Sequence, residues 1–114
     1  LALQREGDLP GARQAFRAAM DSGHEQAAPR AAMNAAALLA RQGDLHGARA
    51  ACRLAIQSGH PDAAPRAAVI LGAVHARQGD ALGARAAYKL AVDSGHADAA
   101  PQAFAELQKL GPAR

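Results

Sequence analysis

The chain has 114 residues, of which 50% are hydrophobic and three are aromatic, and its formal net charge is +3. A chain of this length forms one domain or part of one. Valine and isoleucine together number five, while threonine and tryptophan are absent, which excludes an all-β fold because strands favour β-branched and aromatic residues.

The cysteine count, the apolar runs and the composition indicate the class and the compartment of the protein. The single cysteine, Cys52, excludes an intrachain disulfide and any zinc site with several cysteines, and it fits a reducing compartment, so we expect a cytoplasmic protein. No apolar run approaches the roughly 18 residues of a membrane span, which predicts no membrane partner. The chain has 34 alanines and 11 arginines but only two lysines, a composition typical of a GC-rich bacterial genome. It begins with Leu1, so we expect a fragment of a longer protein.

The sequence repeats every 36 residues. Two short motifs recur at this step: Ser-Gly-His begins at Ser22, Ser58 and Ser94, and Gly-Asp begins at Gly7, Gly43 and Gly79. Residues 37–72 and 73–108 are identical at 22 of 36 positions. This predicts one tandem array over 1–114, with units at about 1–28, 29–64 and 65–100 and a terminal helix over 101–110.

The units predict six full helices and an N-terminal stub. In chain order, the stub ends before Gly7, a helix spans 9–21, and two helices flank the turn at Gly43. The next pair spans 63–77 and 81–93, and the last helix follows Pro101 to about Leu110. Asp62 suits an N-cap and Gly79 a left-handed helix end. The short Gly-Asp links predict antiparallel helical hairpins.

Apolar residues follow helical spacing in both helices of the middle unit. They are Ala32, Ala35, Ala36 and Leu39 in the first helix, and Leu45, Ala48, Cys52, Ala55 and Ile56 in the second. Phe16, Cys52 and Tyr88 occupy one repeat position. We therefore expect Cys52 to be buried, and Cys52→Phe to be accommodated. A unit of this kind needs neighbours to cover its apolar face, which predicts stacking into a solenoid.

The repeat resembles the tetratricopeptide family. The matching residues are Leu71-Gly72 in the first helix, Gln78-Gly79-Asp80 at the turn, and Ala84, Tyr88 and Ala91 in the second helix. The period is 36 rather than that family's 34, and alanine replaces the family's large residue early in the first helix, at Ala32 and Ala68. The Ser-Gly-His junction is similar to Sel1-like repeats, although their longer Gly-rich loop is missing. The resemblance implies an all-α superhelix whose concave groove binds a peptide or partner protein.

Polar residues at the junctions invite a catalytic or metal-binding interpretation. His24, His60 and His96 are spaced by whole units, on the order of 10 Å apart, whereas one metal needs ligands at about 2 Å. We expect each to bond the backbone of its junction. No histidine and carboxylate pair is placed to activate the junction serines. Nothing in the sequence predicts a cofactor, a metal site or an enzyme.

A second stripe on the first helices is the candidate peptide site. In the middle unit it holds Arg30, Met33, Asn34, Ala37 and Arg41, and in the next unit Arg66, Val69, Ile70, Ala73 and Arg77. By the resemblance this stripe faces the groove. Apolar centres between arginines suit a peptide with acidic and aliphatic side chains. Arg30 and Arg66 lie in first turns, where the helix dipole disfavours a cation, so Asp62, Glu25 or a ligand must offset them.

The leading functional hypothesis is a non-catalytic protein-interaction scaffold. The alternatives are a pentatricopeptide-type RNA-binding array and a regulatory module of a larger protein. The apolar stripe and the scarcity of aromatics favour protein over RNA. The helix after Pro101 carries Phe104, Leu107 and Leu110 with no following helix to cover them. This predicts an exposed apolar strip and end-to-end self-association of the fragment.

Overall fold

The computed structural model describes residues 27–111, in which every regular element is a helix. The helices are α2 (Ala27–Arg41), α3 (Leu45–Gln57), α4 (Ala63–Arg77), α5 (Ala81–Ser94) and α6 (Ala99–Leu110). The bounds predicted for α4 are confirmed, and α5 ends one residue later than predicted. The predicted stub and the helix over 9–21 lie outside the described residues. None of the described helices is long and apolar enough to cross a bilayer.

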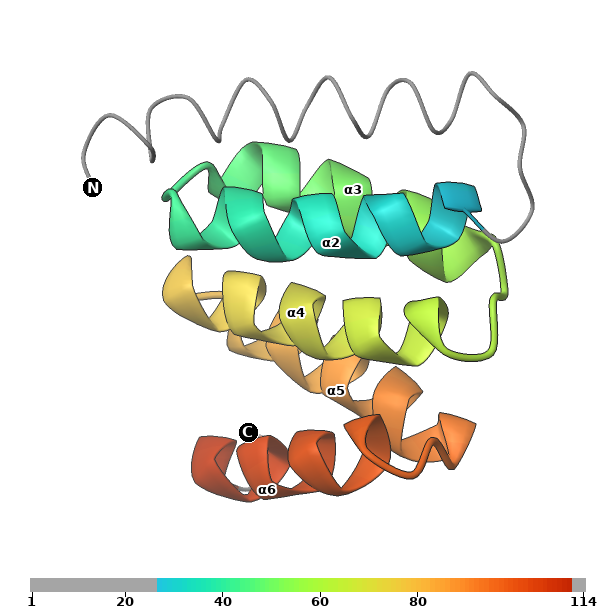
Figure 1. The fold of residues 1–114 in the computed structure, drawn as a ribbon. Coiled ribbons are helices and arrows are strands. Elements are labelled where there is room, and N and C mark those ends of the chain that lie inside the picture. The colour runs from blue at the N-terminus through green and yellow to red at the C-terminus, as the bar shows by residue number, and fades with distance from the viewer. Residues whose placement is uncertain (1–26, 112–114) are drawn as a thin grey trace.

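The first helices of successive units form one layer. Figure 1 shows α2, α4 and α6 one below another and running in the same direction, with α3 and α5 behind them. Each of α2 and α4 packs against the second helix of its own hairpin and against the next first helix, and α3 and α5 pack against the first helix that follows each of them. The layer of first helices therefore presents a surface that second helices do not cover.

The two hairpin turns are built as the sequence predicts. Gly43 and Gly79 adopt positive φ angles of 87° and 78°, which side chains other than glycine rarely adopt. Asp44 Oδ1 accepts a hydrogen bond from the Gly47 amide at 3.0 Å, and Asp80 Oδ1 accepts one from the Gly83 amide at 2.8 Å. Each carboxylate thus caps the second helix of its hairpin, so the chain reverses within three residues.

The core is made mostly of alanine side chains, with Leu39, Leu71 and Val74 among its larger members. Cys52 is fully buried, which confirms the prediction, and Tyr88 at the same repeat position is 3% exposed. Burial raises the pKa of the Cys52 thiol to about 12. Burial likewise raises the pKa of the Tyr88 phenol. Both groups therefore serve as packing elements of the core.

Tyr88 lies directly on the backbone of α4. A Cβ atom added at Gly72 would fall 2.5 Å from Tyr88 Cε1, closer than real contacts allow. The equivalent pair in the first hairpin is Ala36 and Cys52, both fully buried. In the second hairpin the Tyr88 ring fills the space where a methyl group at position 72 would lie. In the first hairpin the equivalent space is filled by the Ala36 methyl group. The repeat alignment alone predicted that Cys52→Phe would be accommodated. The structure instead indicates that the new ring would clash with the Ala36 methyl group.

Candidate functional site

A cavity of about 590 Å³ opens along the layer of first helices. It is lined by Asn34, Ala37, Leu38, Ala40 and Arg41 of α2, by Val69, Ile70, Ala73, Val74 and Arg77 of α4, and by Gln102 of α6. We call this cavity the groove. Its lining is apolar in the middle, and two arginines stand at the end where α2 and α4 finish.

The groove brings together seven of the ten residues predicted from the sequence. These are Asn34, Ala37, Arg41, Val69, Ile70, Ala73 and Arg77. Arg30, Met33 and Arg66 do not line it. Arg30 is exposed, whereas Met33 is partly buried against the core. The centre of the predicted stripe therefore lines the groove, while Arg30, Met33 and Arg66 lie outside it, and peptide binding by these residues stays a prediction.

Four lining residues were not predicted. Leu38 and Val74 share one repeat position, next to Ala37 and Ala73, and Ala40 lies one residue before Arg41. Gln102 occupies the repeat position of Arg30 and Arg66. The repeat frame could have identified Gln102, because α6 continues the same layer and presents the same position to it. Nothing in the helical spacing distinguishes Leu38 from a core residue.

Arg66 is held by two carboxylates at the start of α4. Its Nε donates to Asp62 Oδ1 at 2.9 Å, and its Nη2 donates to Asp98 Oδ2 at 3.1 Å. The hydrogen bond to Asp62 is the largest of the effects that raise the pKa of Arg66. The helix dipole disfavours a cation in a first turn, and for Arg66 the carboxylates of Asp62 and of Asp98, from the next junction, compensate for it. Glu25, the other candidate, lies outside the described residues. Arg66 is thus a contact between units.

The junction histidines cap the first helices. His60 Nδ1 accepts hydrogen bonds from the amides of Asp62 and Ala63 at 3.1 and 3.0 Å. His96 Nδ1 accepts from the amides of Asp98 and Ala99 at the same two distances. Backbone bonding by these two histidines is confirmed, and His24 lies outside the described residues. The expectation that Asp62 caps α4 through its side chain is wrong, because the imidazole takes that role.

Asp62 instead links one junction to the next. Its Oδ1 lies 2.8 Å from His96 Nε2 and also accepts from Arg66. Since His96 Nδ1 is an acceptor, the neutral ring carries its proton on Nε2 and donates it to Asp62. The His96 hydrogen bond, followed by that of Arg66, lowers the pKa of Asp62 to about 2. The carboxylate therefore remains ionised at any pH near neutrality.

The junction serines use their hydroxyls locally. Ser58 Oγ donates to the Ala55 carbonyl at 2.5 Å and accepts from the His60 amide at 3.1 Å. Ser94 repeats both bonds with Ala91 and His96. Within residues 27–111 no group of three or more His, Cys, Asp or Glu side chains could hold a metal ion. The hydroxyls of Ser58 and Ser94 are therefore engaged in hydrogen bonds to the backbone of their own junctions.

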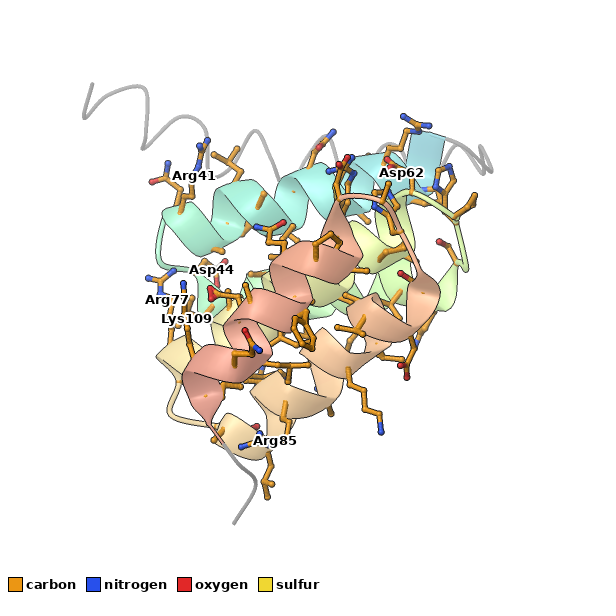
Figure 2. All side chains as sticks on the ribbon, turned by 90° about the horizontal axis from the view of Figure 1, so that it is seen from below. Arg41, Asp44, Asp62, Arg77, Arg85 and Lys109 are labelled. Carbon is orange, nitrogen blue, oxygen red and sulfur yellow. The ribbon has the colours of Figure 1, made fainter. Side chains whose placement is uncertain are left out.

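Arg41 and Arg77 lie at the end of the groove where α2 and α4 finish, and unlike Arg66 they have no carboxylate partner among the described residues. Arg77 Nη1 donates to the Ala40 carbonyl at 2.8 Å and so reaches from α4 to the end of α2. Arg41 is exposed and forms no hydrogen bond or ion pair in the part of the chain that the structure describes. Figure 2 shows both side chains at one end of the helix layer and Asp62 at the opposite end.

The apolar strip expected on α6 is smaller than predicted. Phe104 is 53% exposed, but Leu107 and Leu110 are partly buried against the core between α5 and α6. Leu82 and Leu90 of α5 are also exposed. Of the three residues of the expected strip, only Phe104 is therefore largely exposed.

Comparison of the chain with protein-family models, with curated proteins and with solved structures found no match.

Proposed function

We propose that the chain is a tetratricopeptide-type superhelical array of about three units, with Sel1-like junctions, that serves as a non-catalytic protein-interaction scaffold. Its groove binds a peptide or a segment of a partner protein. Support comes from the 36-residue repeat, from the parallel layer of α2, α4 and α6, and from the uncovered cavity along that layer. A cytoplasmic location and a place within a larger protein belong to the same proposal.

One observation carries the proposal most directly. Repeat-equivalent side chains of α2 and α4 line the same cavity, namely Ala37 with Ala73 and Arg41 with Arg77. The small side chains of Ala37, which is partly buried, and Ala73, which is exposed, leave room for an incoming side chain. The volume of about 590 Å³ lies within the range of ligand pockets. An extended peptide can therefore contact neighbouring units with the same residue types.

RNA binding is the competing function. Sequence-specific RNA recognition relies on stacking of bases on aromatic or arginine planes. Tyr88 is buried, and Phe104 does not line the groove. The described aromatic residues thus give no stacking platform inside the cavity, and only Arg41 and Arg77 at one end could stack on a base. The apolar centre at Val69, Ile70 and Ala73 suits a polypeptide ligand better.

A photo-reactive residue placed at Ala73 tests the groove in the full parent chain. Ala86, which is exposed on α5 and does not line the groove, provides the matched control position. We expect a polypeptide adduct at position 73, little at position 86, and loss of the adduct when Ile70→Glu fills the groove with a charge. Equal capture at both positions, or an adduct removed by nuclease, would contradict the proposal.

A further inference from the structure

Three of the four exposed large hydrophobic side chains among residues 27–111 belong to the second helices. They are Leu54 of α3 and Leu82 and Leu90 of α5, which are 37%, 72% and 53% exposed. None of them belongs to the buried stripe of its helix. Figure 1 shows both helices behind the layer of first helices, and neither helix lines the groove. We call the exposed side of α3 and α5, with Ala50, Leu54, Leu82, Ala86 and Leu90 as its apolar residues, the outer face.

The apolar residues of the outer face follow rows along the two helices. On α5, Leu82, Ala86 and Leu90 are spaced by four residues and therefore lie along one side of the helix. On α3, Ala50 and Leu54 repeat the last two members of this row. The leucines of α5 stand on either side of a small alanine, so they project from the helix. Side chains that project in this way can enter the apolar zone of a bilayer without a change of fold.

The two helices present these rows on the same side of the molecule. Ala87 of α5 packs in the core cluster that holds Cys52 of α3, and Ile56 of α3 packs against the cluster that holds Tyr88 of α5. The buried sides of both helices thus face one interior, and Figure 1 shows both helices in the rear layer. A surface that faces this layer therefore meets both rows.

The outer face carries more positive than negative charge. The two helices have four cationic side chains, Arg49, Arg53, Arg85 and Lys89, and one carboxylate, Asp93, while the carboxylates at their N-caps accept backbone hydrogen bonds. Arg53 and Lys89 share one repeat position, and each is exposed directly before an exposed leucine. Within residues 27–111 neither forms a hydrogen bond or an ion pair. These two cations are therefore available to a ligand.

The combination of cation and leucine indicates the kind of ligand. Arg30 and Arg41 of α2 are exposed as well, but α2 has no exposed large hydrophobic side chain. Nucleic acid phosphates would attract the cations of the outer face but would gain nothing from its leucines. An anionic bilayer uses both, because its headgroups attract the cations while the leucines enter the apolar zone.

We infer that the outer face docks the chain on an anionic lipid surface, with Leu54, Leu82 and Leu90 entering the bilayer and Arg53 and Lys89 at the level of the headgroups. The sequence-based expectation of no membrane partner depended on the lack of a spanning segment, which a surface contact does not need. The cytoplasmic leaflet is the anionic one, so the inference agrees with the proposed cytoplasmic location. The groove is lined by the other layer and stays open to a peptide.

The test is sedimentation of the chain with sucrose-loaded vesicles. Vesicles of phosphatidylcholine alone are compared with vesicles in which about one third of the lipid is phosphatidylserine. We expect at least tenfold tighter binding to the anionic vesicles, weakening as salt is raised. Lys89→Gln and Arg53→Gln should each weaken this binding about fivefold, the effect of one cation near an anionic surface. Leu82→Gln with Leu90→Gln should weaken it at least tenfold.

Two variants serve as controls, and circular dichroism checks that every variant is folded. Arg30→Gln removes an exposed cation from the layer of first helices, so binding should stay within about twofold of the unmodified chain. Asp93→Asn removes the one carboxylate of α5 and should strengthen binding about threefold. Equal losses in Arg30→Gln and Lys89→Gln would show that net charge alone attracts the chain, which would overturn the inference.

Three other results would also overturn the inference. The first is equal binding to both kinds of vesicle, and the second is no binding to the anionic vesicles at about 1 mM accessible lipid. The third is a polypeptide adduct at position 86 in the cross-linking experiment, because it would place a protein on the outer face. Cross-linking at Ala73 decides the proposed function of the groove independently of the vesicle experiment.

Discussion

The hairpins α2–α3 and α4–α5 follow one plan but fill their cores differently. The first places Ala36 on its first helix and Cys52 on its second, and the other places Gly72 and Tyr88 at the same two positions. All four are buried. Compared with the first hairpin, the second hairpin has a larger side chain on its second helix, at Tyr88, and no side chain at the facing position on its first helix, at Gly72. The size of the residue at one of these two positions therefore limits the size that the other can have, so the two positions must be changed together.

The largest effect is expected from Gly72→Ala. The new Cβ would meet the Tyr88 ring at 2.5 Å, and the buried ring has little space to move. Overpacking of this kind costs about 3 kcal/mol of unfolding free energy, measured by urea titration. The converse variant, Ala36→Gly, should cost less, about 2 kcal/mol, because it removes a buried methyl group and lowers helix propensity. Equal losses would show that the two hairpins are not packed differently.

Cys52→Phe is the next test, with an expected loss of about 2 kcal/mol. A ring on α3 placed like that of Tyr88 would overlap the Ala36 methyl group. Adding Ala36→Gly should recover most of the loss, since it recreates the pair found in the second hairpin. The coupling energy comes from a double-mutant cycle of urea titrations. If the double variant is no more stable than Cys52→Phe alone, the pairing of the two positions is refuted.

The junctions that follow the two hairpins can be compared in the same way. His60 and His96 make identical backbone bonds, but His60 is 7% exposed, and the Ala63 amide that it caps is more deeply buried than that of Ala99. Replacement of either by alanine should cost about 1 kcal/mol, as for other helix caps, with the larger loss at His60. Thermal unfolding measures it, and His46→Ala on exposed α3 surface provides the control. A larger loss at His96 would show that its Asp62 contact outweighs the buried cap.

The smallest effect concerns pH. Because the folded-state pKa of Asp62 is lowered to about 2 by His96 and Arg66, its stabilising contribution is complete above about pH 4 and is lost as the pH falls towards 2. Urea titrations at pH 5 and pH 3 should show a smaller loss of stability on acidification for Asp62→Asn than for the unmodified chain. Asp98→Asn, which leaves the His96 contact intact, should retain the larger loss. Identical pH dependence in all three proteins would show that Asp62 does not cause the loss of stability on acidification.

The sequence predicted most of this architecture because each signal acts locally. Positive-φ glycines, Asp44 and Asp80 fix the turns through contacts within three residues, and the 36-residue period fixes which helices are equivalent. The sequence predicted that His60 bonds the backbone of its junction, but it assigned the cap of α4 to Asp62 because the N-cap rule favours aspartate. The imidazole instead accepts from the amides of Asp62 and Ala63. The partners of Arg66 and Arg77 lie 32 and 37 residues away along the chain. Spacing within one helix carries no information on such contacts between units, whereas Asp62, the partner of Arg66 four residues away, was among the offsets expected from the sequence.

The two contacts of α4 with its neighbours bear on how fast a ligand is captured. Arg66 ties the beginning of α4 to the junction before α6, and Arg77 ties its end to α2. With both ends of the helix anchored, the width of the groove is set before any ligand arrives. For the proposed peptide ligand, association would then need no opening step, and its rate would depend on diffusion and orientation, about 10⁵–10⁷ M⁻¹s⁻¹ for an unsteered encounter. Differences in affinity among ligands would accordingly arise from how long each one stays.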